Sequence, residues 1–163
     1  MKTGIFFTFL LLFILGCTSK QTEQLTQQQK EQIKSEVKAV VDSLFAKFEK
    51  LEWQGALQLY SPELVNVFDS SVVYYEAYKK RWSGISNAVS IKATPISDNY
   101  IVLSNDLVIS EWIGKLEILW KSGDKFIWNP ISYTNVLKKI DGQWKAIYEH
   151  PYGTLVIQAA DKK

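Results

Sequence analysis

The apolar residues of this 163-residue chain change their spacing once, near Gly84, and this change limits the possible folds more than any other feature. Before Gly84 they recur every three or four positions, which is the period of an amphipathic helix. After Gly84 they alternate in twos, which is the period of a half-buried strand. The sequence therefore predicts an α+β domain in which amino-terminal helices pack on a carboxy-terminal antiparallel sheet.

Three helices are predicted in the first half, with a short strand between the second and the third. The first starts at Thr26, which has capping-box spacing with Gln29. Its apolar stripe consists of Ile33, Val37, Val40, Val41, Leu44, Phe45, Phe48 and Leu51. The second spans 54–60 and ends before Pro62, which cannot continue a helix. The third spans 72–82 and places on one face Tyr74, Tyr75, Tyr78 and Trp82.

The second half is predicted to form four strands, because residues typical of turns occur at 97–99, 104–106, 122–124 and 141–142. Regular alternation in the last strand puts one set of side chains on the helix-covered face: Trp144, Ala146, Tyr148 and His150. The opposite face receives Lys145, Ile147 and Glu149. Both faces carry apolar residues, so we expect the outer face to meet a second copy or another protein.

The amino terminus indicates export. The apolar run 5–15 is shorter than the roughly 20 residues of a membrane-spanning helix and has the form of a signal peptide. The end of this run, Ile14-Leu15-Gly16-Cys17, resembles the lipobox of bacterial lipoproteins. This resemblance implies a signal peptide at 1–16, a lipidated Cys17 with a polar tether at 17–30, a domain at 31–157 and a polar tail at 158–163. It also implies a cell-envelope protein with its lipid anchor in a bacterial membrane, the outer rather than the inner, and its domain outside the cytoplasm.

The composition argues against several kinds of site. Cys17 is the only cysteine, so no disulfide forms within the chain. A formal net charge of +2 gives no reason to expect a nucleic-acid partner. One histidine and one cysteine are too few for a transition-metal site, and no Gly-rich phosphate loop occurs. We therefore predict no metal and no cofactor.

Two segments resemble the SnoaL-like part of the nuclear transport factor 2-like superfamily: 51–63 and 133–150, the second with a glycine turn before Trp144 and His150 at its end. The resemblance implies a cone-like fold, in which three amino-terminal helices pack on a strongly curved antiparallel sheet around an apolar pocket. It also implies pairing of two copies through the outer face of the sheet.

Aromatic residues are the candidates for lining that pocket. Six Trp and eight Tyr all follow residue 50, which is more than the centre of a cone can hold. A pocket for a small apolar or aromatic molecule would use such side chains. The predicted ligand-binding residues are Tyr60, Tyr78, Trp82, Trp112, Trp128, Tyr133, Asn135, Trp144 and Tyr148.

Asp69 and His150 are the candidates for acid–base chemistry. His150 is the only histidine, and an ordinary imidazole titrates near neutral pH. By resemblance, Asp69 lies within one residue of the base in the ketosteroid isomerase branch, whereas Leu44 and Ser132 stand where that branch has its oxyanion-hole donors. Structural roles remain open for both candidates: Asp69 as a helix cap, and His150 as a rim residue bonded to backbone.

Three functions follow as alternatives. The first is non-catalytic binding of a small, largely apolar ligand or a partner protein. The second is a cofactor-independent enzyme of the isomerase, dehydratase or polyketide-cyclase kind that uses Asp69 and His150. The third is a structural or assembly protein that docks through the outer face of the sheet.

Overall fold

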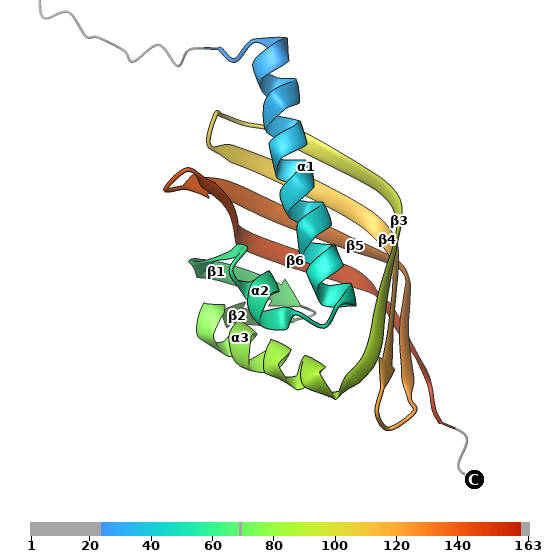
Figure 1. Ribbon diagram of the computed structural model, residues 1–163. Coiled ribbons are helices and arrows are strands. Elements are labelled where there is room, and N and C mark those ends of the chain that lie inside the picture. The colour runs from blue at the N-terminus through green and yellow to red at the C-terminus, as the bar shows by residue number, and fades with distance from the viewer. Residues whose placement is uncertain (1–23, 69, 161–163) are drawn as a thin grey trace, which may run out of the picture.

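Helix α1 (Gln27–Glu49) lies across one face of a curved sheet in the computed structural model, which describes residues 24–68 and 70–160 (Figure 1). Its start confirms the predicted capping box, because the side chains of Thr26 and Gln29 each accept a hydrogen bond from the other's backbone N–H. The buried residues of α1 all belong to the predicted stripe: Ile33, Val37, Val41, Leu44 and Phe48.

The predictions for the signal peptide, Cys17 and Asp69 fall outside the described residues. Within those residues, every helix is too short or too polar to cross a membrane.

The predicted second and third helices are present but shorter. Helix α2 covers only Trp53–Leu57, and Tyr60 already begins strand β1 (Tyr60–Phe68). The prediction of a helix over 72–82 was wrong for its first residues, which form strand β2 (Ser71–Tyr74) before helix α3 (Tyr75–Ser83). Val72 and Val73 favour a strand because their branched side chains fit a pleated surface, and both pair with β1.

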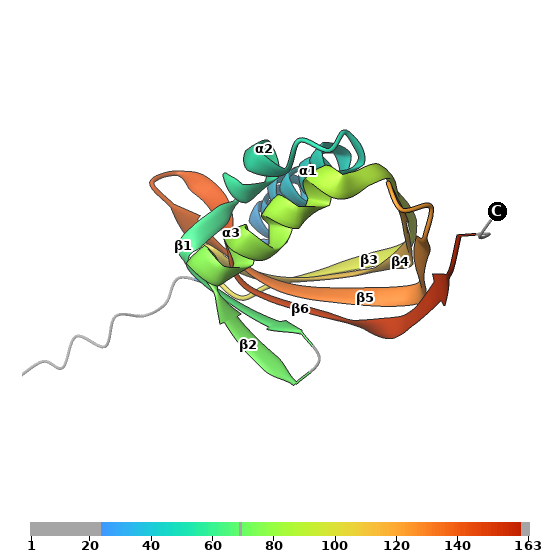
Figure 2. The same ribbon diagram turned by 90° about the horizontal axis from the view of Figure 1, so that it is seen from below.

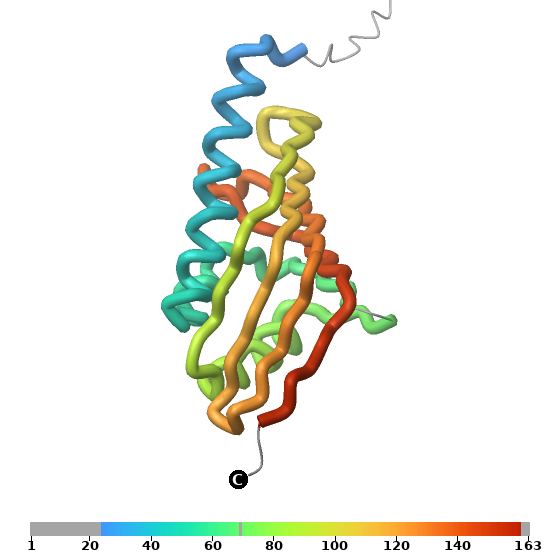
Figure 3. Tube along the Cα trace, turned by 90° about the vertical axis from the view of Figure 1, so that its right-hand side faces the viewer, coloured from blue at the N-terminus to red at the C-terminus, as the bar shows by residue number. Residues whose placement is uncertain are grey.

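One six-stranded sheet follows the order β2-β1-β6-β5-β4-β3. After the 3-10 turn η1 (Gly84–Asn87), the four long strands run side by side as β3 (Ala88–Val102), β4 (Leu107–Trp120), β5 (Lys125–Ile140) and β6 (Gln143–Gln158) (Figure 3). Neighbouring strands are antiparallel except β1 and β6, which are parallel. The turn predicted at 97–99 is instead part of β3, next to a register shift between Pro95 and Ser97.

The sheet bends along one row of residues that crosses it from β3 to β6. Cross-strand pairing joins Pro95 to Gly114, Gly114 to Ile131, and Ile131 to Gly153. Register shifts lie beside this row in each pair of strands, and bulges with glycines are the usual means of curving a sheet. As a result the sheet curves around the side on which the helices lie (Figure 2).

A bulge in β6 changes which side chains lie on the helix-covered face of the sheet. Ala146 pairs with Leu137 and Tyr148 pairs with Val136, so Ile147 is an extra residue on β6. The predicted regular alternation is therefore wrong beyond Ala146. Glu149 is buried on the helix-covered face, whereas Tyr148 and His150 share the outer face with their cross-strand partners Val136 and Thr134.

Candidate functional site

A cavity of about 250 Å³ lies between α3, η1 and the sheet. Its volume is close to the lower limit of typical ligand pockets, so it suits a small molecule. Most of its wall is aliphatic or aromatic. The lining residues come from six elements: Asn66, Phe68, Tyr78, Arg81, Trp82, Gly84, Ile85, Leu116, Ile118, Trp120, Trp128, Ile131, Tyr133, Glu149 and Pro151.

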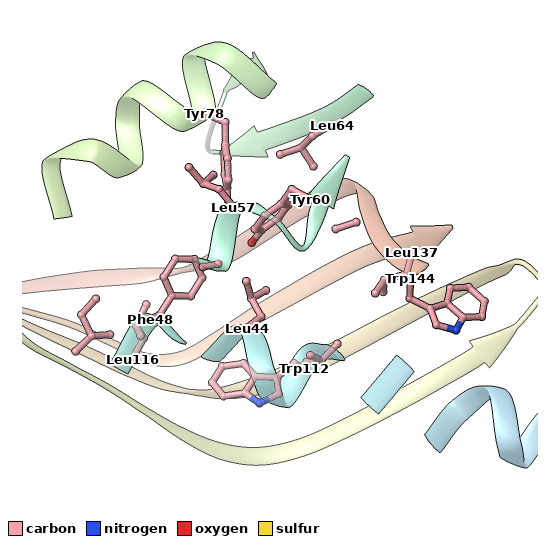
Figure 4. Packing of buried hydrophobic residues seen from close by; sticks show 14 of the residues in the cluster. Leu44, Phe48, Leu57, Tyr60, Leu64, Tyr78, Trp112, Leu116, Leu137 and Trp144 are labelled. Atoms are coloured by element: carbon pink, nitrogen blue, oxygen red, sulfur yellow. The ribbon is translucent and has the colours of Figure 1, made fainter. Parts of the chain in front are cut away.

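Glu149 is the buried polar centre of this site. The residue is only 2% exposed, and its carboxyl group accepts three hydrogen bonds. The Tyr60 hydroxyl donates to Oε2 at 2.6 Å, and Oε1 accepts from the Tyr78 hydroxyl at 2.8 Å and from Asn66 Nδ2 at 2.9 Å. Tyr60 lies on β1 and Tyr78 on α3 (Figure 4), and their ring centroids are 5.0 Å apart.

Burial raises the pKa of Glu149, because removing a carboxylate from water disfavours its charged form. The three hydrogen bonds and the charge of Arg81 act in the opposite direction without cancelling this effect. Burial also raises the pKa values of Tyr60 and Tyr78, so both phenols keep their protons and remain donors. The site thus holds a carboxyl group whose proton is unusually tightly bound.

Four of the predicted ligand-binding residues line the cavity: Tyr78, Trp82, Trp128 and Tyr133. Tyr60 does not line the cavity, but its hydroxyl donates a hydrogen bond to Glu149, which does. The other predicted residues lie elsewhere. Trp112 stacks on Phe45 at a centroid distance of 4.2 Å, and Trp144 donates from Nε1 to Glu36 at 2.9 Å.

Asn135 is buried on the inner face beside Glu149 but does not line the cavity. Tyr148 and His150 are on the outer face, so the predicted position of His150 on the pocket face is wrong. Asp69 is not among the described residues, so the structure does not test whether it forms a pair with His150. A role for either residue in chemistry stays a prediction.

Glu149, Asn66, Arg81 and Trp120 were missed by the sequence analysis. Glu149 was assigned to the outer face because alternation was assumed to be unbroken through β6. Arg81 belongs to a basic run, 79–81, which has the composition of a solvated helix face. No pattern in the sequence singles out Asn66, which becomes relevant only because β1 lies beside β6.

Between residues 24 and 68 and between 70 and 160, no three His, Asp or Glu side chains are grouped to hold a metal ion. The ionisable groups of acids and bases at the cavity wall are the Glu149 carboxyl and the Arg81 guanidinium. They can accept and donate hydrogen bonds to a polar group on an otherwise apolar molecule, and Glu149 can exchange a proton with it.

The curved sheet, the three helices on one of its faces and the enclosed pocket define the nuclear transport factor 2-like fold, and solved structures with this fold superpose on the chain. A provisionally assigned scytalone dehydratase from Novosphingobium aromaticivorans has a TM-score of 0.74 at 13% identity over 85% of this chain and 94% of its own. A hexachlorocyclohexane dehydrochlorinase has a TM-score of 0.69 at 9% identity, over 82% of this chain and 94% of its own. A provisional dehydratase of the nuclear transport factor 2-like family from Streptomyces avermitilis has a TM-score of 0.65 at 12% identity, with 77% and 99% covered.

These similarities concern the fold. No protein-family model matches the sequence, and no curated protein matches it.

Proposed function

We propose that this chain is a SnoaL-like domain that binds a small, largely apolar molecule in the pocket beneath α3 without transforming it. The observation that carries this proposal is the cavity wall, in which aromatic and aliphatic side chains surround two polar groups, the Glu149 carboxyl and the Arg81 guanidinium. Such a wall stabilises an apolar ligand by removing its surface from water, and the polar groups orient it. In this proposal a lipid on Cys17 holds the domain at an outer-membrane surface, outside the cytoplasm.

Filling the cavity should abolish binding. Ile118 lies on the cavity wall, and Ile109 is on the outer face of the same strand, where it pairs with Val136. Ile118→Trp should remove any small molecule that native mass spectrometry detects on the protein purified from its own host. Ile109→Trp should leave that molecule bound. Equal retention by both variants would place the ligand outside the pocket, provided that both unfold at similar temperatures.

An enzymatic function is the second candidate, and Glu149 is the observation that favours it. A buried carboxyl group with a raised pKa in an apolar pocket is the usual form of a general acid or base. Solved structures with this fold include proteins named as dehydratases and a dehydrochlorinase. The proposed chemistry is therefore a cofactor-independent isomerisation, elimination or cyclisation, with Glu149 in place of the Asp69–His150 pair.

Deuterium incorporation distinguishes an enzyme from a binding protein. The retained molecule, incubated with the protein in D₂O, should keep its carbon-bound hydrogens if the domain only binds. An enzyme that removes and returns a carbon-bound proton would introduce deuterium, and Glu149→Gln would stop this exchange. The measurement is the mass of the recovered ligand.

We also propose that two copies pair through the outer face of the sheet. Exposed apolar side chains on β3 and β4 include Ile101 and Ile113, and β6 adds Tyr152 and Val156. An exposed apolar surface of this kind is typical of an interaction site. Sedimentation of the purified protein should give twice the monomer mass, and Ile113→Asp should reduce it to the monomer. A monomer at high concentration would contradict the pairing and leave a different protein as the partner for this face.

A further inference from the structure

A row of polar side chains crosses the buried face of the sheet, although the rows on either side are mostly apolar. Cross-strand pairing places Tyr100 opposite Ser110, Ser110 opposite Asn135, and Asn135 opposite Glu149. The flanking row on one side consists of Val102, Val108, Leu137 and Ala146, and that on the other includes Trp112, Tyr133 and Pro151. Cross-strand neighbours have Cβ atoms about 5 Å apart, so adjacent members of the row are close.

Two members of this row have hydrogen-bonding atoms that no other described residue satisfies. Ser110 is 1% exposed and Asn135 is 4% exposed, yet Oγ of Ser110 and Oδ1 of Asn135 are both without a partner. An unsatisfied buried polar atom costs about 1–3 kcal/mol, and two such atoms side by side are therefore unfavourable. Buried polar atoms of this kind are normally satisfied by ordered water.

Oε2 of the neighbouring Glu149 carboxyl can accept one more hydrogen bond. Its Oε1 receives two hydrogen bonds, from Tyr78 and Asn66, whereas Oε2 receives one, from Tyr60. A carboxylate oxygen can accept two. Ser110, Asn135 and Glu149 together therefore offer at least three polar partners, which is the number that a buried water usually has.

We propose that Ser110 and Asn135 hold ordered water that joins them to the Glu149 carboxyl, and that this water supplies protons to Glu149 from behind the pocket. The Ser110 hydroxyl and each water accept one proton and release another, so none of them changes its net charge. The Asn135 amide orients the water. Tyr100, the next member of the row, lies at the edge strand β3, where its hydroxyl is 3.3 Å from Asp98 and where Lys38 pairs with Asp98 at 2.7 Å.

This water path would matter when a ligand occupies the pocket. An apolar ligand in the cavity would separate Glu149 from the solvent on the pocket side, whereas the other members of the row, Tyr100, Ser110 and Asn135, are not part of the cavity wall. Glu149 could then gain or lose its proton while the ligand stays bound. The groups that face Glu149 from other elements are Tyr60 and Asn66 on β1, Tyr78 and Arg81 on α3, and Tyr133 on β5.

The sign of one stability change tests the water site. If Ser110 binds water, Ser110→Ala should lower the unfolding temperature by about 2–4 °C, since roughly 1 kcal/mol is lost. Ser132→Ala, on the outer face of β5, should change it little. A rise in the unfolding temperature of Ser110→Ala would mean that its hydroxyl is simply unsatisfied, and this would overturn the proposal. A crystal structure should show water within hydrogen-bond distance of Ser110 Oγ and Asn135 Oδ1.

Hydrogen–deuterium exchange of the carboxyl group tests the path. Infrared difference spectra between the wild type and Glu149→Gln identify the protonated carboxyl band, and transfer to D₂O shifts it as exchange proceeds. Exchange should be equally fast in Ile118→Trp, in which the pocket is filled, and at least severalfold slower in Asn135→Leu. If filling the pocket slows exchange and Asn135→Leu does not, protons reach Glu149 through the pocket and the proposed path is wrong. Should Asn135→Leu fail to fold, Ser110→Ala replaces it in the same comparison.

Discussion

Glu149→Leu should lower the free energy of unfolding by about 3 kcal/mol or more at neutral pH. The leucine leaves two buried donors, the Tyr60 and Tyr78 hydroxyls, without an acceptor, and it leaves the Asn66 amide only its 3.5 Å contact with the backbone carbonyl oxygen of residue 149. Each buried donor that loses its acceptor costs about 1–3 kcal/mol. Chemical denaturation of the wild type and the variant measures the difference.

A double substitution provides the control. Tyr60→Phe with Tyr78→Phe, introduced into the Glu149→Leu variant, removes both orphaned hydroxyls and should restore part of the lost stability. In the wild-type background the same pair should destabilise, since Glu149 would lose two of its donors. If the two phenylalanines destabilise equally in both backgrounds, the hydroxyls and Glu149 do not act as one network.

The contribution of Glu149 to the free energy of unfolding should decrease as the pH rises. Because burial raises the pKa of Glu149, the folded protein binds its proton more tightly than the unfolded chain does. Stability from this group is therefore complete below the unfolded value of about 4.3 and is lost as the pH rises through the folded value. Glu149→Gln lacks this loss, so its stability relative to wild type should rise across that window. A relative stability that does not change with pH would contradict the raised pKa.

Gly114→Ala should be the most destabilising single-methyl addition in the sheet, by about 3 kcal/mol. A Cβ at this position would be 2.5 Å from both the Thr94 carbonyl oxygen and Cζ2 of Trp112, and closer still to Cη2 of the same indole. The backbone carbonyl cannot move without breaking the pairing of β3 with β4, and the indole is held by stacking on Phe45.

Gly84→Ala is the matched control, because a Cβ there meets no atom within 4 Å. This change should leave stability within about 1 kcal/mol of wild type or raise it slightly, since alanine restricts the unfolded chain. Thermal unfolding of both variants gives the comparison, in which about 3 kcal/mol corresponds to a loss of roughly 6–12 °C. Equal effects would show that the bend at Gly114 tolerates a side chain.

The fold was predictable because its main signals are local. The capping box at Thr26 and the stripe on α1 depend on residues within one helix, and the turns at 104–106, 122–124 and 141–142 depend on their own composition. The strand β2 was not predictable in this way, because its four residues form a strand through pairing with β1.

The candidate site was predictable only in part, for a different reason. Tyr78, Trp82, Trp128 and Tyr133 could be identified because aromatic side chains on a buried face commonly line the pocket of a cone. Glu149 could not, since its direction depends on one extra residue in β6. Trp144 illustrates the opposite error, because it does face inward but bonds to Glu36 on α1 and does not line the cavity.

The bulge at Ile147 has a consequence for comparing this chain with its relatives. Inward-facing residues of β6 are separated by two, three and two positions, at Trp144, Ala146, Glu149 and Pro151, where an unbroken strand would separate them by two throughout. The same amino acids without the bulge would place Tyr148 at the position of Glu149 and His150 at the position of Pro151, so the site would lose its carboxyl group. Relatives with an inward-facing carboxyl group at this position should therefore be recognised by the two-three-two spacing. A column-by-column alignment with an unbulged strand would equate Glu149 with an outward-facing residue.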